Sequence, residues 1–174
     1  TLAEVLLSDT GDNAAGFDND WYDFDIVTQA VLLFPDLVEA ASNPEAELTA
    51  FLPNDRAFQV LVNDLTGQWI HDEQGVFNAV ASLGTDTVKT VLTYHLVGAK
   101  ISAADALASD GAQVTTLQGG TFTVRVANPL LSLIRLEDND PNSGDGGVIF
   151  SKFNIGGALA NGYAHGISVV LRPV

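Results

Sequence analysis

The spacing of apolar residues changes near residue 112, and this change limits the folds that the chain can adopt. Before this point apolar residues recur every three or four positions, as Ile26 and Ala30 do, which indicates helices with one buried face. Beyond it Phe122, Val124 and Val126 alternate with polar residues, which is typical of strands. Helices followed by strands indicate a single α+β domain.

The first half of the chain predicts several short helices. Asp23 or Asp25 is expected to cap one of them, and Pro35 is expected to end it and to begin a second. The stretch "ELTAFLP" predicts a strand that ends at Pro53, after which Asn54 is placed to cap a further helix.

The segment "GTDTVKTVLTYHLVGAK" gives the best helix signal, with Thr85 as the expected cap and Gly98 as the expected end. His95 lies within about 30° of the centre of its apolar stripe, and Tyr94 lies roughly 130° away on the flank. We therefore expect His95 to be buried, neutral and hydrogen-bonded to a neighbouring loop, near Asn54–Asp55 or residues 161–165. Tyr94 is expected to be accessible to a partner.

The second half predicts strands. "AQVTTLQGGTFTVRV" has the pattern of a hairpin, and "LLSLIRLE", "GVIFSKFNI" and "GISVVLRP" are expected to follow as further strands.

The charge balance excludes two classes of partner. The chain of 174 residues has 22 acidic and 7 basic side chains and a net charge of −15. Nucleic acid and anionic lipid headgroups are bound through lysine and arginine, so neither is expected as a partner. No stretch is long and apolar enough for membrane insertion. The absence of cysteine excludes disulfides and thiol catalysis.

Sequence signatures of catalysis are absent, which predicts that the protein is not an enzyme. The chain lacks a nucleophile elbow, a phosphate-binding loop, a dinucleotide fingerprint and a zinc-protease motif. Its histidines, His71, His95 and His165, do not have the spacing of local metal ligands. An enzyme would require His71 or His165 to meet a carboxylate in a pocket.

The loop "EDNDPNSGDGG", residues 137–147, places oxygen-bearing side chains at alternating positions, as calcium loops do. An EF-hand would have glycine where Ser143 stands and glutamate where Ile149 stands, so the ligand set is incomplete. A solvated turn between strands, in which such residues are also common, is therefore favoured over a calcium site. The candidate calcium ligands are Asp138, Asp140, Asn142 and Asp145.

Three stretches, in order, resemble the fasciclin-like (fasciclin I type) domain family. "LTAFLPNDRAFQVL" is similar to the first family signature, "VLTYHLVGAKIS" to the central Tyr-His segment, and "NGYAHGISVVLRP" to the second signature. The resemblance covers about residues 24–173. It departs from the pattern at Ser168, where an acid often follows the His-x-Ile group.

The resemblance implies a single domain over residues 1–174, with an α+β, wedge-shaped fold. Its core would be like a β-sandwich, with short helices packed beside it. Residues 1–23 are expected to be an acidic N-terminal extension, and residues 137–147 an acidic, glycine-rich insertion. The residues of the two signatures are expected to be structural: Asn54, Asp55, Ala57, Phe58, Asn161, Gly162 and His165.

The implied function is adhesion without enzymatic activity. Such domains are mostly secreted, periplasmic or cell-surface modules, and the expected partner is a cell-surface or matrix protein or polysaccharide. In animal members the Tyr-His segment has been linked to integrin recognition, which implies a partner-binding role for Tyr94 and His95. The alternative is a soluble binder of an apolar small molecule such as a carotenoid, as in some algal members. No cofactor is expected, and calcium at the 137–147 loop is the one candidate considered.

Overall fold

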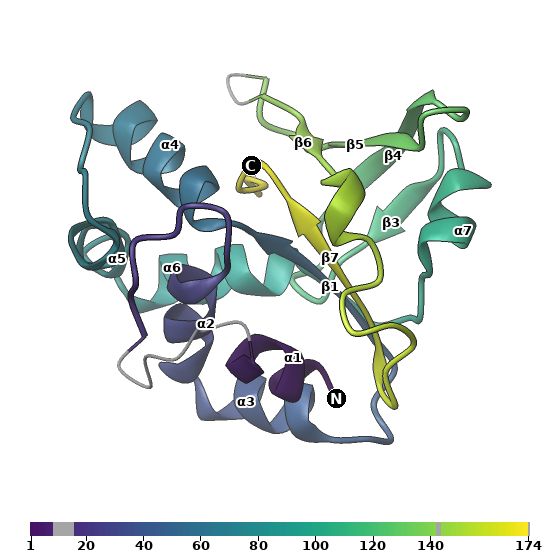
Figure 1. Ribbon diagram of the computed structural model, residues 1–174, viewed down its shortest axis with the longest axis horizontal. Coiled ribbons are helices and arrows are strands. Elements are labelled where there is room, and N and C mark those ends of the chain that lie inside the picture. The colour runs from purple at the N-terminus through teal and green to yellow at the C-terminus, as the bar shows by residue number, and fades with distance from the viewer. Residues whose placement is uncertain (9–15, 142–143, 174) are drawn as a thin grey trace.

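A computed structural model describes residues 1–8, 16–141 and 144–173 of the chain (Figure 1). Helices dominate the first part and strands the second, as the change in periodicity predicts. The helices are α1 (Leu2–Ser8), α2 (Asp25–Leu32), α3 (Pro35–Ser42), α4 (Asp55–Thr66), α5 (Glu73–Ala81), α6 (Thr85–Tyr94), α7 (Ala103–Leu107) and the 3-10 helix η1 (Phe150–Lys152). The strands are β1 (Leu48–Pro53), β2 (Leu96–Val97), β3 (Gln113–Thr115), β4 (Thr121–Asn128), β5 (Leu133–Glu137), β6 (Gly146–Gly147) and β7 (Gly162–Ile167).

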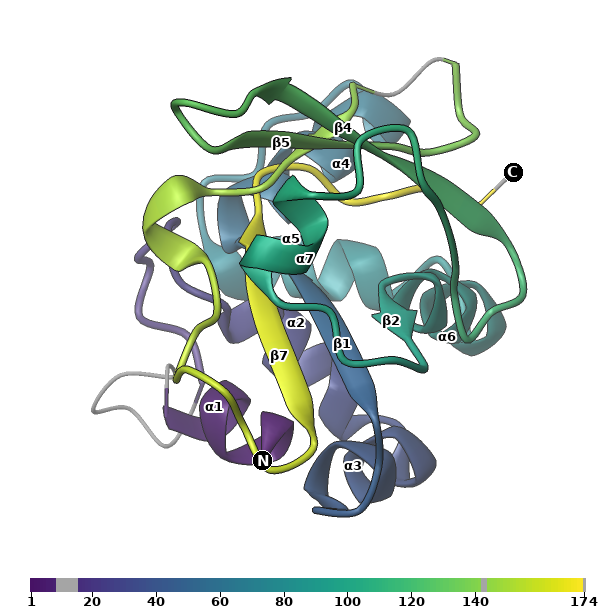
Figure 2. The ribbon, with the colours of Figure 1, turned by 90° about the vertical axis from the view of Figure 1, so that its right-hand side faces the viewer.

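The strands form two sheets. The first has the order β2-β1-β7, in which β1 is antiparallel to β2 and parallel to β7. The second is an antiparallel sheet with the order β3-β4-β5-β6. A bridge between Val148 and Ile167 brings the end of β7 beside the second sheet. Figure 2 shows β1 and β7 running side by side beneath β4 and β5. The predicted α+β class is confirmed.

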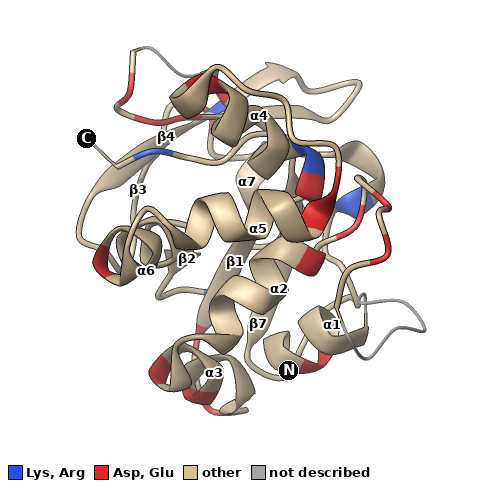
Figure 3. Cartoon of the chain, turned by 90° about the vertical axis from the view of Figure 1, so that its left-hand side faces the viewer, with Lys and Arg blue, Asp and Glu red and all other residues tan. Residues whose placement is uncertain are grey.

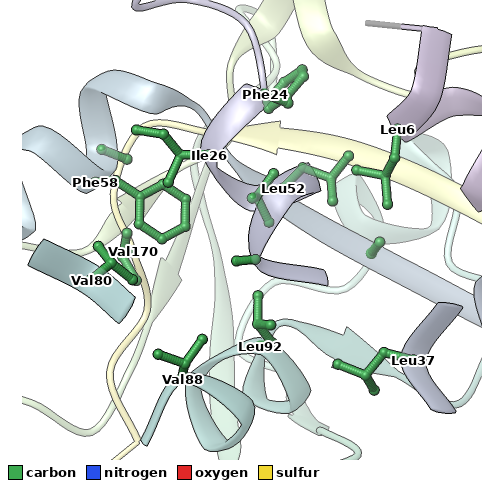
Figure 4. Packing of buried hydrophobic residues seen from close by; sticks show 14 of the residues in the cluster. Leu6, Phe24, Ile26, Leu37, Leu52, Phe58, Val80, Val88, Leu92 and Val170 are labelled. Atoms are coloured by element: carbon green, nitrogen blue, oxygen red, sulfur yellow. The ribbon is translucent and has the colours of Figure 1, made fainter. Parts of the chain in front are cut away.

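Strand β1 separates two apolar clusters because both of its faces are buried. Ala50 and Leu52 face the cluster that the helices cover, with Ile26 and Phe58 among its members (Figure 4). Phe51 points the other way, into a cluster between the two sheets. Successive side chains of a strand alternate between its faces, so one strand can contribute to both clusters.

Two predicted helix caps are wrong. Helix α2 begins after Phe24, and neither Asp23 nor Asp25 caps it through its side chain. Helix α6 begins after Gly84, and Thr85 is its first residue rather than its cap. A cap depends on the backbone angles before the helix, which the residue types alone do not determine.

Helix α6 ends at Tyr94, four residues before the predicted end at Gly98. Leu96 and Val97 pair with β1 instead of extending the helix. The central Tyr-His segment is therefore a junction between a helix and a strand, because pairing with a buried strand replaces the helical hydrogen bonds.

Two of the later predicted strands also differ. The segment "GVIFSKFNI" contributes only Gly147 to the short strand β6 before it turns into η1. The last strand, β7, ends at Ile167 rather than continuing to the chain end. Leu2 and Leu6 of α1, which belong to the predicted acidic extension 1–23, are buried in the first cluster. In the described ranges no helix has both the length and the apolar character needed to cross a bilayer.

Candidate functional site

The side chain of Tyr94 is buried, which contradicts the predicted accessible flank. Its exposed fraction is 0%, its ring packs edge-on against Phe122, and its hydroxyl donates a hydrogen bond of 2.6 Å to the carbonyl of Thr121. Because the helix ends at Tyr94, the flank that periodicity assigns to solvent faces the second sheet. Neither ring of the Tyr-His pair is offered to a partner at the surface.

His95 is buried, as its place in the apolar stripe predicts, and both ring nitrogens are satisfied. Nε2 accepts from the amide of Leu171 at 2.9 Å, so Nδ1 carries the proton that it shares with the carbonyl of Val91 at 2.8 Å. Burial lowers the pKa of His95 to about 4, so the ring is neutral at neutral pH. The partner from a distant segment is Leu171 of the C-terminal segment, rather than residues 54–55 or 161–165. His95 thus joins the end of α6 to the C-terminal segment that follows β7.

The first signature positions the starts of two helices. Asn54 caps α4 by accepting from the amide of Ala57 at 3.0 Å, and Phe58 is buried in the first cluster. Asp55, the first residue of α4, reaches across to α2. Its carboxyl oxygens accept from the amides of Asp25 and Ile26 at 3.1 and 2.8 Å. Asp55 therefore caps a helix that begins 30 residues earlier, which single-helix reasoning does not anticipate.

The second signature holds β7 against its neighbours. Asn161 is fully buried, accepts from the amide of Leu2 and donates to the carbonyl of Ala41, so it ties α1 and α3 to β7. Gly162 faces Leu48 of β1, where a Cβ would lie 1.6 Å from the Leu48 oxygen.

His165 lies in β7 and is buried like His95. Its Nε2 bonds the carbonyl of Ile101 at 2.9 Å, and its Nδ1 accepts from the amide of Asn154. Burial lowers its pKa. With both nitrogens engaged by backbone groups, His165 is a structural connector. His71 is exposed.

The 137–147 loop connects β5 to β6, and part of its predicted ligand set is held by other groups. Asp138 accepts from the amides of Asp140 and Arg172, and Asp140 lies 3.5 Å from the Arg172 guanidinium. Asp145 is exposed, and Asn142 lies outside the described residues. Calcium binding by this loop stays a prediction, and a neighbouring arginine disfavours it.

Comparison with known families identifies the fold. Residues 24–173 match the family described as Fasciclin domain. The chain belongs to the fasciclin domain family. This confirms the resemblance drawn from the three signatures. The chain also resembles a solved FAS1 domain pair from the insect cell adhesion molecule fasciclin I, with 18% identity and a TM-score of 0.48. That match covers 97% of this chain and 43% of the domain pair. No curated protein sequence matches this chain.

The fasciclin domain has a groove between α4, α6 and the C-terminal segment, with a volume of about 440 Å³. Leu61, Leu65 and Leu83 line it with Val91 and Val170. Asp86, Asp140 and Arg172 add polar groups at the same groove. Its size falls in the range of small-molecule sites, which start at about 300 Å³. By contrast, the apolar cavity beside His95 measures about 30 Å³ and holds little more than a water molecule.

An apolar tip projects from the β4–β5 hairpin (Figure 2). Leu130 and Leu131 have exposed fractions of 94% and 60%. The side chain of Asn128 accepts from both of their amides, at 3.0 and 3.1 Å, and fixes the turn. We call Leu130 and Leu131 the hairpin tip. The hydrogen bonds to Asn128 fix the backbone so that both leucine side chains point outward. The alternation of apolar and polar residues in the sequence does not reveal this arrangement.

Five carboxyl groups gather where three helices begin, and sequence reasoning missed this cluster. Asp25, Asp55 and Glu73 are each the first residue of their helix, and all three have exposed fractions of 0%. Figure 3 shows the acidic starts of α2, α4 and α5 on one side of the molecule. Asp18 and Asp23 join them from the preceding loop. The acidic first turns are visible in the sequence, but their convergence is a property of the tertiary fold. We call these five residues the carboxyl cluster.

Burial of the carboxyl cluster makes its charges costly. Desolvation raises the pKa of Asp25 to about 7, and neighbouring acidic groups, Asp23 first, add to the shift. Desolvation also raises the pKa of Asp55 and of Glu73. The positive ends of the helix dipoles favour ionised carboxylates and by themselves would lower these pKa values. Because the pKa values are raised instead, burial and mutual repulsion have the larger effect.

Proposed function

We propose that this fasciclin domain is a non-enzymatic adhesion module that acts outside the cell or at its surface. In this role it contacts a protein or polysaccharide partner. Membership in a family known from cell adhesion supports the proposal. The buried, fully hydrogen-bonded state of His95 and His165 also supports a role without catalysis, because neither ring is available for proton transfer.

The hairpin tip is the surface through which we propose that contact occurs, and it favours a protein partner. Leu130 stands almost fully in solvent and Leu131 is mostly exposed beside it, on a turn that Asn128 fixes. Exposed apolar side chains on a fixed backbone lose little conformational freedom on binding, which favours affinity. The observation that carries this proposal is the 94% exposure of Leu130.

Replacing both leucines of the hairpin tip with serine is expected to weaken adhesion at least about fivefold, because apolar anchors dominate interface energies. The measurement is binding of beads that carry the domain to cells and to immobilised matrix proteins and polysaccharides. Leu33→Ser is the matched control, since Leu33 is 51% exposed on a different surface. If the original domain binds none of these surfaces, the adhesion proposal fails. If it binds and the double variant binds equally, only the assignment to the hairpin tip fails.

The groove supports a second candidate function, binding of an apolar small molecule such as a carotenoid. Its volume and leucine lining favour such a ligand. We expect the purified domain to take up carotenoid and to carry its visible absorption band through gel filtration. Leu65→Asp places a charge in the lining and is expected to abolish the band, whereas Leu33→Asp is expected to retain it. A colourless domain after incubation would contradict this function.

A further inference from the structure

The carboxyl cluster contains a group with the dimensions of a metal site. One side-chain oxygen from each of Asp18, Asp25 and Glu73 lies within 4.8 Å of the other two. Calcium binds oxygen at 2.3–2.6 Å, so two ligand oxygens on opposite sides of one ion are at most about 5 Å apart. The three oxygens can therefore contact a single ion without a change of fold.

Two of these carboxyl groups have a buried oxygen with no hydrogen-bond partner. Asp25 uses one oxygen to accept from the amide of Asp18, and Glu73 uses one to accept from the amide of Asn19. Asp25 Oδ1 and Glu73 Oε1 remain unsatisfied although both residues are 0% exposed. Leaving a buried carboxylate oxygen unpaired costs free energy, so these two atoms point to a ligand that is positively charged.

Among the described residues, no ion pair supplies a positive charge to Asp18, Asp25 or Glu73. Arg56, which follows Asp55 in the chain, lies over the ring of Trp69 at 4.9 Å and bonds Gln59. Lys152 lies over the ring of Phe24.

A second group of oxygens, from Asp23, Asp25 and Asp55, is less suited to an ion. Both oxygens of Asp55 already accept from backbone amides of α2. Asp55 therefore has no carboxyl oxygen left without a partner, unlike Asp25 and Glu73.

We propose that Asp18, Asp25 and Glu73 form a binding site for a hard divalent cation of the calcium type. Carboxylate oxygens are the ligands that calcium prefers, and its coordination number of six to eight leaves room for water. Asp18 is exposed, so it provides both the entry path and the water-facing side of the site. The ion would join the loop before α2 to the start of α5, because its ligands come from both.

Calorimetric titration of the chelator-treated full chain with calcium chloride at low ionic strength tests this site. We expect one ion per chain, with a dissociation constant of about 0.1–1 mM, as for extracellular calcium modules. About 10 mM calcium is expected to raise the unfolding temperature by at least about 5 °C. Magnesium is expected to bind at least about tenfold more weakly, because it demands a nearly ideal octahedron. Equal affinity for the two ions would overturn the calcium assignment.

Asp25→Asn and Glu73→Gln are expected to weaken calcium binding at least about tenfold, since each removes one charged ligand. Asp25→Asn is also expected to raise the unfolding temperature of the cation-free chain, because it removes one of several like charges. A higher unfolding temperature would show that Asp25→Asn is still folded, so that its weaker calcium binding reflects loss of the site. Asp138→Asn and Asp145→Asn, in the 137–147 loop, are the controls and should bind as the original chain does. Absence of binding heat, unchanged binding in Asp25→Asn and Glu73→Gln, or loss of binding in the loop variants would each overturn the proposal.

Discussion

Replacing Gly162 with alanine is expected to destabilise the fasciclin domain by more than about 4 kcal/mol, a large share of the roughly 5–15 kcal/mol that stabilises a typical domain. The added Cβ would lie 1.6 Å from the carbonyl oxygen of Leu48 and 2.7 Å from its carbon. Both atoms are backbone, so no side chain can move aside. Gly162 also has a φ of +148°, which residues with a side chain rarely adopt. Thermal unfolding followed by circular dichroism, together with the soluble yield, measures the effect.

Gly157→Ala is the matched control for this prediction. Gly157 also has a positive φ, of +79°, but a Cβ there meets no atom within 4 Å. Gly157→Ala should therefore lower the free energy of unfolding only by the cost of backbone strain, about 1–2 kcal/mol. If Gly162→Ala and Gly157→Ala unfold at similar temperatures, the close approach of β1 and β7 is not what requires glycine at residue 162.

Replacing Asp55 with alanine is expected to cost about 3 kcal/mol of folding free energy. The change leaves the buried amides of Asp25 and Ile26 without acceptors, and each unsatisfied amide costs about 1–3 kcal/mol. Relief of repulsion within the carboxyl cluster offsets part of this loss. Urea unfolding measures the change in the free energy of unfolding.

Two further substitutions separate the capping role from a general charge effect. Asp55→Asn keeps one acceptor oxygen and is expected to lose less stability than Asp55→Ala. Asp86→Asn removes an exposed first-turn charge from α6 and should change the free energy of unfolding by less than about 1 kcal/mol. A loss below about 1 kcal/mol in Asp55→Ala would show that the bonds from α4 to α2 contribute little.

The three family signatures are mainly structural in this chain. Asn54 and Asp55 fix the starts of α4 and α2, His95 joins α6 to the C-terminal segment, and Asn161 joins β7 to α1 and α3. The groups proposed to meet a protein partner or an ion lie elsewhere, at the hairpin tip and at Asp18, Asp25 and Glu73. A module of this kind can keep its fold constant while its exposed loops change in specificity.

Much of the local structure could be predicted because it depends on neighbours in the sequence. Pro35 begins α3, Asn54 caps α4, and Ser102 forms a capping box with Asp105, since each interaction spans only a few residues. The hairpin of β3 and β4 follows from alternation around a short turn. The family was also identifiable from sequence, because the motif residues and their order suffice for that.

The sequence by itself determined the α+β class, most helices, the burial of His95 and the family. Only the tertiary structure decided that Tyr94 is buried, that Asp55 caps α2, and that Asp18, Asp25 and Glu73 converge. The physical reason is that periodicity reports one buried face per element, whereas these features depend on a second element that arrives from far along the chain. Pairing of Leu96 and Val97 with β1 ends α6 early and turns Tyr94 inward. The packing of α2, α4 and α5 likewise brings together charges that are far apart in the sequence.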